Sequence, residues 1–200
     1  MHLTHRWAIF VAVVGSFVAC GTAGGRVDQA SQAGAGGLAL SAPSAVPIGT
    51  ESAGPDLRQV SMMDACDGPS FNLIIGPGTC NRNGGVNFSE FVAQLTAHQS
   101  AGAWHNAPSQ TDAWLGDSLT AVNKGGEVHT FTRVADFGGG IVPFLNNLAG
   151  TPDVAPECNQ EGTFVPPGGT DSESLNQNGV LKFQCCIHPW MRTTVLVKSH

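Results

Sequence analysis

Three side chains that bind soft metal ions recur at three-residue spacing near the end of the chain. Cys185, His188 and Met191 lie in the segment Phe-Gln-Cys-Cys-Ile-His-Pro-Trp-Met, between two runs that are typical of strands. A tight loop at this position turns a thiolate, an imidazole and a thioether toward one point. Sulfur ligands together with imidazole suit copper, and two His, one Cys and a weak Met ligand are typical of electron-transferring copper sites. The spacing therefore predicts a copper site that needs a second His from elsewhere in the chain.

His129 is the best candidate for that second imidazole. It lies within an extended run, residues 127–132, which follows a predicted strand and turn. His105, which follows Trp104 and precedes Asn106, is the alternative first ligand. His98 falls near the end of a predicted helix, where a protonated imidazole is favourable without any metal.

The elements that must position these residues are predicted to form an all-β sandwich with one short added helix. The helix is expected over Asn87–His98, where apolar residues recur at helical spacing and Asn87 and Glu90 have the spacing of a capping box. Short extended runs broken by Gly, Pro and Asn predict strands at Phe71–Ile75, Ala113–Trp114, Ser118–Val122, Val128–Val134, Val180–Cys185 and Thr193–Lys198. Strands of this length separated by turns favour an antiparallel sandwich or barrel over a parallel sheet.

The N-terminal part of the chain has the pattern of an export signal followed by a linker. In residues 1–20, one Arg precedes a run of apolar and small residues that is too short to span a bilayer. The end of this run resembles a bacterial lipoprotein box with Cys20 as the lipidated residue, and ordinary cleavage near Ala23 is the alternative. Residues 21–60 are dominated by Gly, Ala, Ser and Pro, which predicts a disordered, flexible linker.

These features place the folded domain at residues 61–200, outside the cytoplasm. We expect a periplasmic or cell-surface protein, anchored to a bacterial membrane only through a lipid on Cys20. The 9 basic and 15 acidic residues provide no positive patch for nucleic acid, so a nucleic-acid partner is not expected. Export would remove Arg6 from a chain of net charge −6, which leaves −7 and favours partners with a positive face.

Two blocks of the chain together resemble the cupredoxin family, of the plastocyanin, amicyanin and azurin type. The block from Gly116-Asp117 to His129 resembles the family's strand, turn and first histidine. The block from Phe183 to Met191 resembles its ligand loop in the short amicyanin-like spacing, and Thr193–Val197 resembles the closing strand. The resemblance covers roughly residues 104–200.

This resemblance implies a Greek-key β-sandwich with one type 1 (blue) copper ion. The ligands would be His129, Cys185, His188 and Met191, and the protein would carry single electrons between redox partners by transient contact. The resemblance also implies that the edge of His188 lies near the surface in an apolar patch, to which residues 142–144 are expected to contribute.

Three features depart from the family pattern. Thr130 stands where cupredoxins commonly have Asn, next to the first ligand. Cys186 adjoins Cys185, but alternation along a strand puts their side chains on opposite sides, so only one thiolate is expected to reach the metal. The segment before residue 104 does not correspond to any part of the minimal family fold.

Four cysteines remain once Cys20 is assigned to lipid and Cys185 to metal. They allow three disulfide pairings. We favour Cys66 with Cys80, which closes a short Gly-rich loop, and Cys158 with Cys186, which ties the irregular segment after Phe144 to the ligand strand.

The sequence leaves other functions open beside electron transfer. A copper carrier or buffer without redox turnover is one alternative, and a metal-free interaction domain of the same fold is another. An enzyme is not expected, since multicopper oxidases and copper nitrite reductases need additional His-rich centres, and the exported chain would keep only five His.

Overall fold

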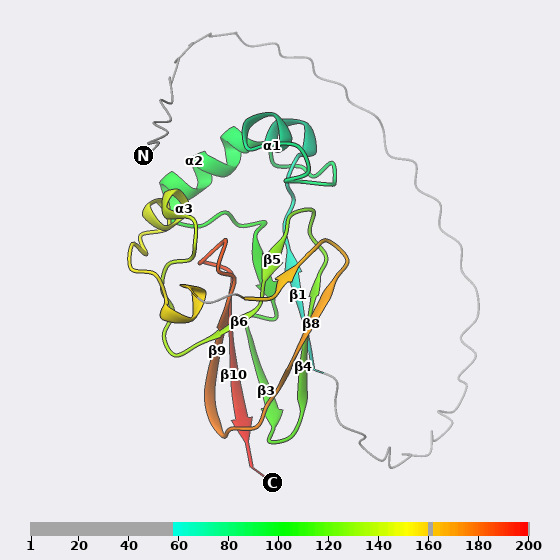
Figure 1. Cartoon of the computed structure of the whole chain (residues 1–200), viewed down its shortest axis with the longest axis vertical. Coiled ribbons are helices and arrows are strands. Elements are labelled where there is room, and N and C mark those ends of the chain that lie inside the picture. Colours follow the sequence, from blue (N-terminus) through cyan, green and yellow to red (C-terminus); the bar gives the residue numbers. More distant parts are fainter. Residues whose placement is uncertain (1–57, 160–161, 200) are drawn as a thin grey trace, which may run out of the picture. The chain divides into compact units, whose positions relative to one another are not determined.

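The computed structural model of the protein describes residues 58–159 and 162–199 (Figure 1). The predicted export signal, Cys20 and most of the predicted linker lie outside the described residues. The elements in chain order are β1 (Arg58–Met63), α1 (Gly68–Ile74), α2 (Phe88–His98), β2 (His105–Ala107), β3 (Gln110–Trp114), β4 (Ser118–Asn123), β5 (His129–Thr130), β6 (Thr132–Val134), α3 (Pro143–Leu148), the 3₁₀ helix η1 (Pro156–Asn159), β7 (Phe164–Val165), β8 (Thr170–Ser174), β9 (Gly179–Gln184) and β10 (Arg192–Lys198). No helix in these ranges is long and apolar enough to cross a membrane.

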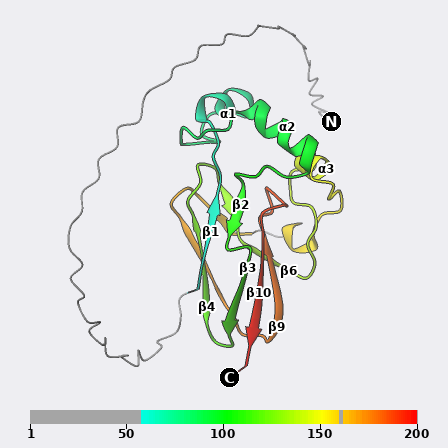
Figure 2. The same cartoon turned by 180° about the vertical axis from the view of Figure 1, so that it is seen from behind.

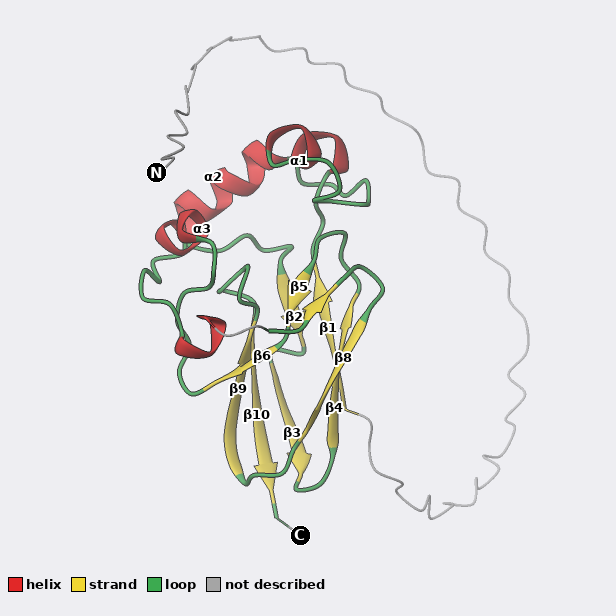
Figure 3. Cartoon of the chain, in the orientation of Figure 1, coloured by secondary structure: helices red, strands yellow, loops and turns green. Residues whose placement is uncertain are grey.

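Two four-stranded sheets form the body of the protein. One has the strand order β2-β1-β4-β8 and the other β3-β10-β9-β6, while β5 and β7 form a separate two-stranded ribbon. Figure 3 shows the strands running lengthwise, with α1, α2 and α3 gathered at one end. The predicted all-β sandwich is confirmed, but it has three short α-helices where one was predicted.

The sheets differ from the prediction in being mixed rather than wholly antiparallel. Strand β1 pairs with β4 in parallel, and β10 pairs in parallel with β3. Parallel neighbours need a crossover between them. In the first sheet the crossover from β1 to β4 contains α1 and α2, the segment that does not match the minimal family fold.

The main apolar core lies between the two sheets. The first sheet contributes Val60, Met62 and Leu119, and the second contributes Phe183 and Val195, all fully buried. Along β1, β4 and β10 these residues alternate with more exposed neighbours, as expected where one face of a sheet is buried and the other meets water. The core thus includes residues from β1, which begins at Arg58, within the segment predicted as linker.

The predicted strand at Phe71–Ile75 is wrong, because most of this run belongs to α1. The Asp67 side chain accepts a hydrogen bond from the Ser70 N–H, and a Pro occupies the first turn of the helix. Both features are typical of a helix start. The periodicity of a short apolar run does not distinguish a strand from a helix. Here the N-cap and the Pro favour the helix.

Helix α2 confirms the prediction for residues 87–98. Asn87 and Glu90 form both bonds of a capping box, and His98 lies in the last turn. Phe91 on this helix contacts Phe71 of α1 and Trp104, with ring centroids 5.5 Å and 4.6 Å apart. Helices α1, α2 and α3 lie together at the end of the sandwich opposite the C-terminal end of β10, as the view in Figure 2 shows.

The predicted strand Val128–Val134 is divided into β5 and β6. His129 and Thr130 pair with β7, whereas Thr132–Val134 pairs with β9. Between them Phe131 is buried and stacks on Phe183, with centroids 4.7 Å apart. The chain therefore changes partner strand at Phe131, next to the first candidate ligand.

Candidate metal centre

The candidate donors come from the ribbon and from the loop that joins β9 to β10. His129 lies on β5, and Cys185, His188 and Met191 lie in the loop. The loop is closed by two backbone hydrogen bonds, from Cys185 N–H to Met191 O at 3.0 Å and from Met191 N–H to His188 O at 2.9 Å. Residues far apart in the sequence are thereby brought to one buried point.

Three donor atoms converge at this point. The Cys185 Sγ lies 3.9 Å from His129 Nδ1 and 3.8 Å from His188 Nδ1. Metal bonds of about 2.3 Å to sulfur and 2.05 Å to nitrogen, as found for zinc, place the two donors about 3.8 Å apart at an angle of 120° and about 3.6 Å apart at the tetrahedral angle. The observed distances therefore leave room for one metal ion bound by one sulfur and two nitrogens.

Cys185 is the one cysteine of the described residues that forms no disulfide, and its side chain is fully buried. The backbone N–H groups of Thr130 and His188 both point at its sulfur, at 3.4 Å. Burial acts to raise the pKa of Cys185, but the two adjacent imidazoles outweigh burial and hold this pKa well below its usual range. The sulfur is thus prepared to act as a thiolate, the form that binds metals.

Met191 is fully buried in the same apolar core as Cys185. Its backbone bonds to both Cys185 and His188 place it at the closing end of the ligand loop. Its role as a weak fourth ligand stays a prediction.

Thr130 occupies the place where the resembling family commonly has Asn. Its backbone N–H points at Cys185 Sγ, and its hydroxyl oxygen accepts the Cys186 N–H at 2.7 Å. The hydroxyl therefore joins β5 to the start of the ligand loop, a connection that orients groups around a metal site.

The two favoured disulfides are both present. Cys66 is bonded to Cys80 and Cys158 to Cys186. The second disulfide removes Cys186 from the possible donors and leaves Cys185 as the thiolate, which agrees with the alternation argument from the sequence.

The alternative first ligand, His105, lies elsewhere. It is exposed on strand β2, and its Nδ1 lies 3.1 Å from the Gly102 carbonyl oxygen. The donor cluster of the described residues contains His129 instead.

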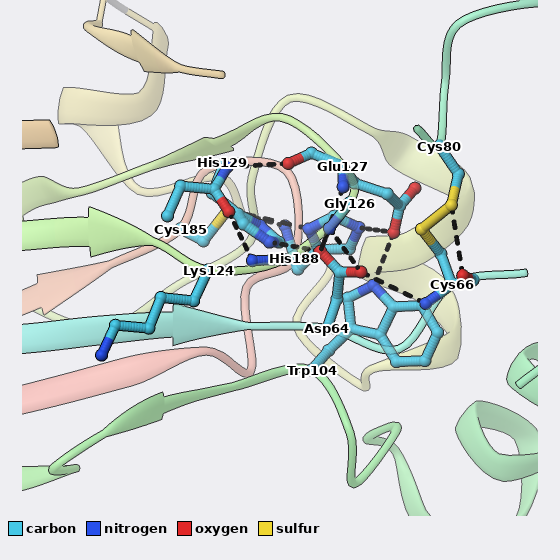
Figure 4. A network of polar contacts seen from close by, with 12 residues as sticks. Asp64, Cys66, Cys80, Trp104, Lys124, Gly126, Glu127, His129, Cys185 and His188 are labelled. Carbon is cyan, nitrogen blue, oxygen red and sulfur yellow. Dashed lines mark hydrogen bonds and ion pairs between the residues drawn. A yellow bond between two sulfur atoms is a disulfide. The ribbon is translucent and has the colours of Figure 1, made fainter. Parts of the chain in front are cut away.

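Two buried carboxylates, which no motif in the sequence pointed to, lie on the Nε2 side of the imidazoles, away from the sulfur (Figure 4). Asp64 Oδ2 is 3.0 Å from His129 Nε2, and Glu127 Oε2 is 3.6 Å from His188 Nε2. Trp104 donates its indole N–H to the same Glu127 oxygen at 2.6 Å. Glu127 could have been suspected, since it precedes His129 by two residues on an extended run. Asp64 follows β1 directly, and no local pattern links it to the site.

The Asp64 carboxylate is held in its charged form. Burial acts to raise its pKa, but hydrogen bonds from His129 and from the N–H groups of Gly126, Glu127 and Cys66 hold the pKa well below its usual range. For His129, burial acts to lower the pKa, but the bonds to Asp64 and Cys185 raise it to about 9. Without a metal, the site therefore pairs an imidazolium with two anions.

His188 lies beside the expected apolar patch, to which Val142 and Phe144 contribute, but its ring is covered and not exposed at the surface. Its exposed fraction is 2%, because rings from α2 and from the ligand loop cover it: Phe91 at 6.4 Å and Trp190 at 5.5 Å between centroids. His188 instead lines an apolar pocket of about 270 Å³ together with Ile187, Val142 and other apolar residues. Helix α2 and the ligand loop cover the His188 ring, so the expected apolar patch forms a pocket.

No protein-family model matches this chain, and no curated protein sequence matches it. Similar solved structures include a novel purple cupredoxin from Nitrosopumilus maritimus, at 13% identity, covering 70% of this chain and 99% of that one with a TM-score of 0.41. A variant of amicyanin in its Cu(I) form has 18% identity over 47% of this chain and 73% of that one, with a TM-score of 0.34. At these identities the likeness concerns the fold alone and assigns no ligand to this chain.

Proposed function

We propose that this protein holds one copper ion and transfers single electrons between redox partners outside the cytoplasm. The observation that carries the proposal is the buried cluster of His129 Nδ1, His188 Nδ1 and Cys185 Sγ, with nitrogen to sulfur distances of 3.9 and 3.8 Å. His129, Cys185 and His188 would hold the ion, with Met191 as a weak fourth ligand. Bound there, copper supplies a couple between Cu(II) and Cu(I).

The side chains of the site are fixed by groups that do not bind the metal. His129 is held by Asp64 at Nε2, and the Cys185 sulfur faces two backbone N–H groups. Thr130 joins β5 to the ligand loop. Because each donor is oriented by the fold, little rearrangement of the protein is needed when the charge at the site changes. Small rearrangement is a requirement for an electron carrier rather than for a site that must release its ion.

The pocket beside His188 supplies a route for the electron. Among the residues that line it, Ile75 and Phe144 are exposed, at 55% and 53%, whereas His188 at its wall is buried. We propose that a partner makes transient apolar contact at this opening and exchanges the electron through the His188 ring. Contacts of this kind are usually small, and a protein of negative net charge favours a partner with a positive face.

Two disulfides support a location outside the cytoplasm. Disulfides persist in oxidising compartments and are rare in the cytosol, and this domain has two of them. The predicted export signal is consistent with this location, and anchoring through Cys20 remains part of the proposal.

Visible spectra of the copper-loaded protein test the proposal. We expect an intense thiolate-to-copper absorption in the wild type that disappears in Cys185→Ser. The matched control is the double variant Cys158→Ser/Cys186→Ser, which removes the neighbouring thiol and its partner and should keep the band. Persistence of the band in Cys185→Ser would refute the assignment of the thiolate.

Two further measurements separate the alternatives. A copper carrier or buffer would bind the ion but would not pass through rapid, reversible reduction and reoxidation at an electrode. A metal-free interaction domain would contain much less than one copper per chain after native purification. We expect one copper per chain and reversible cycling.

A further inference from the structure

The imidazole of His129 has a carboxylate on the side that faces away from the sulfur. Its Nε2 lies 3.0 Å from Asp64 Oδ2, and both side chains are fully buried. Its Nδ1 lies 3.9 Å from Cys185 Sγ. When the ring is neutral, a hydrogen bond from Nε2–H to the carboxylate leaves the lone pair on Nδ1, the nitrogen that faces the cluster. Asp64 therefore selects the tautomer in which His129 can serve as a metal ligand.

The chain is built to accept this carboxylate. The Gly126 N–H lies 2.9 and 2.8 Å from its two oxygens, the Glu127 N–H is 3.1 Å from Oδ2, and the Cys66 N–H is 3.2 Å from Oδ1. A Cβ on Gly125 would lie 1.8 Å from Asp64 Oδ2, so only glycine leaves space for the carboxylate. The position of Asp64 is fixed by the backbone and not by the imidazole alone.

Apart from His129, no cationic side chain in the described part of the chain pairs with the carboxylate. The guanidinium of Arg82 approaches, but it donates to the carbonyl oxygen of Asp64 at 3.1 Å and not to the side chain. Burial makes a charge act strongly on its neighbours. The negative charge of Asp64 therefore acts mainly on His129 and on a metal ion bound at the His129 Nδ1.

A second carboxylate stands behind the other imidazole. Glu127 Oε2 is 3.6 Å from His188 Nε2, longer than a hydrogen bond, and it already accepts the indole N–H of Trp104. Its influence on the ring orientation should be weaker than that of Asp64. Burial raises the pKa of Glu127, whereas hydrogen bonds hold Asp64 as an anion. The anion beside His129 favours the more positively charged form of a metal held at the site.

We propose that Asp64 is a positioning residue of the copper centre, which fixes the tautomer and orientation of His129 and biases the centre toward its oxidised form. This inference rests on the proposed copper function. Carboxylates behind ligating histidines raise ligand basicity, and their loss typically costs about 10- to 100-fold in metal affinity.

The test compares Asp64→Asn with the wild-type protein, using copper itself as the probe. The affinities for Cu(II) and for Cu(I) are measured separately by competition with chelators of known strength, and the reduction potential is measured at an electrode. We expect the Cu(II) affinity of the variant to fall at least tenfold more than its Cu(I) affinity, which corresponds to a rise of about 59 mV in potential. Asp112→Asn is the matched control, since it removes an exposed carboxylate on β3 that pairs only with Lys198. It should change the affinity ratio less than twofold.

A second measurement needs no substitution at Asp64. In the wild-type protein loaded with diamagnetic Cu(I), the Nε2–H of His129 should give a slowly exchanging, downfield proton signal by NMR. If Asp64→Asn does not fold, this signal decides the question, and its absence overturns the inference. Where the variant folds, an affinity ratio within twofold of wild type overturns it as well. Failure of the wild type to bind copper would instead overturn the proposed function, so the two failures are distinguishable.

Discussion

Removing the Cys158–Cys186 disulfide should destabilise the protein without dismantling the ligand loop. The disulfide is buried in a small apolar cluster of its own, with Val134 and Ala155, apart from the main core. The backbone of Cys186 is held independently, because its N–H donates to the Thr130 hydroxyl oxygen and its carbonyl oxygen accepts the Ile141 N–H, both at 2.7 Å. The double variant Cys158→Ala/Cys186→Ala therefore removes the covalent link but leaves the bonds that orient Cys185.

The expected loss follows from the length of the closed loop. Cys158 and Cys186 are 28 residues apart in sequence, and Cys66 and Cys80 are 14 apart. In the chain-entropy description, loops of these lengths give about 3.6 and about 3.0 kcal/mol of stabilisation at 25 °C. Doubling the loop length thus accounts for the difference of about 0.6 kcal/mol.

Denaturant unfolding of the metal-free protein, followed by circular dichroism without reducing agent, measures both losses. The Cys66→Ala/Cys80→Ala variant serves as the comparison. We expect the free energy of unfolding to fall by about 3 to 4 kcal/mol in the Cys158/Cys186 variant, and the copper-loaded form to keep its visible absorption.

Two results would refute this reasoning. A loss below about 1 kcal/mol would mean that the link does not constrain the unfolded chain as the loop length requires. Loss of the visible band at a temperature where the variant remains folded would mean that the hydrogen bonds to Thr130 and Ile141 do not suffice to hold the ligand loop.

Three further outcomes follow from the geometry of the site. The pKa of His129 is raised to about 9 in the metal-free protein, so protons compete with the metal for this imidazole below that pH. The affinity for Cu(I) should therefore rise about tenfold per pH unit from pH 7 to 8 and level off above pH 9. An affinity that does not change with pH, measured by chelator competition, would contradict this expectation. Gly140→Ala places a Cβ 1.9 Å from the Cys186 carbonyl oxygen, so the free energy of unfolding should drop by about 2 kcal/mol or more, and an unchanged melting temperature would count against it. His105→Ala should leave the visible spectrum and the copper stoichiometry unchanged, because His105 is exposed on β2; altered absorption would restore it as a candidate ligand.

The ligand loop could be predicted from the sequence because its donors are close together in the chain. Cys185, His188 and Met191 fall within seven residues between two strands, and such a loop can bend only in a few ways. Helix α2 was equally accessible, because its capping box and apolar spacing are local signals. The pairing of His129 with this loop needed the resemblance to a known family, since nothing within residues 127–132 specifies which distant strand they meet.

Other features depend on contacts that no local pattern encodes. Helix α1 had the composition of a strand, and its start is set by Asp67 and the following Pro. The parallel pairs β1–β4 and β3–β10 arise from crossovers that bring separated segments together. The burial of His188 follows from Phe91 on α2, which lies nearly a hundred residues earlier in the chain.

The sequence by itself determined which atoms can bind a metal, because the donor chemistry of Cys, His and Met belongs to the residues and the loop spacing is local. It also determined the two disulfides to within three pairings, since only four cysteines remained to be joined. Only the tertiary structure decided that Asp64 stands behind His129 and Glu127 behind His188. These carboxylates reach their places through the packing of β1 and of the turn at Gly125 and Gly126 against the site, and long-range packing leaves no signature in the spacing of neighbouring residues.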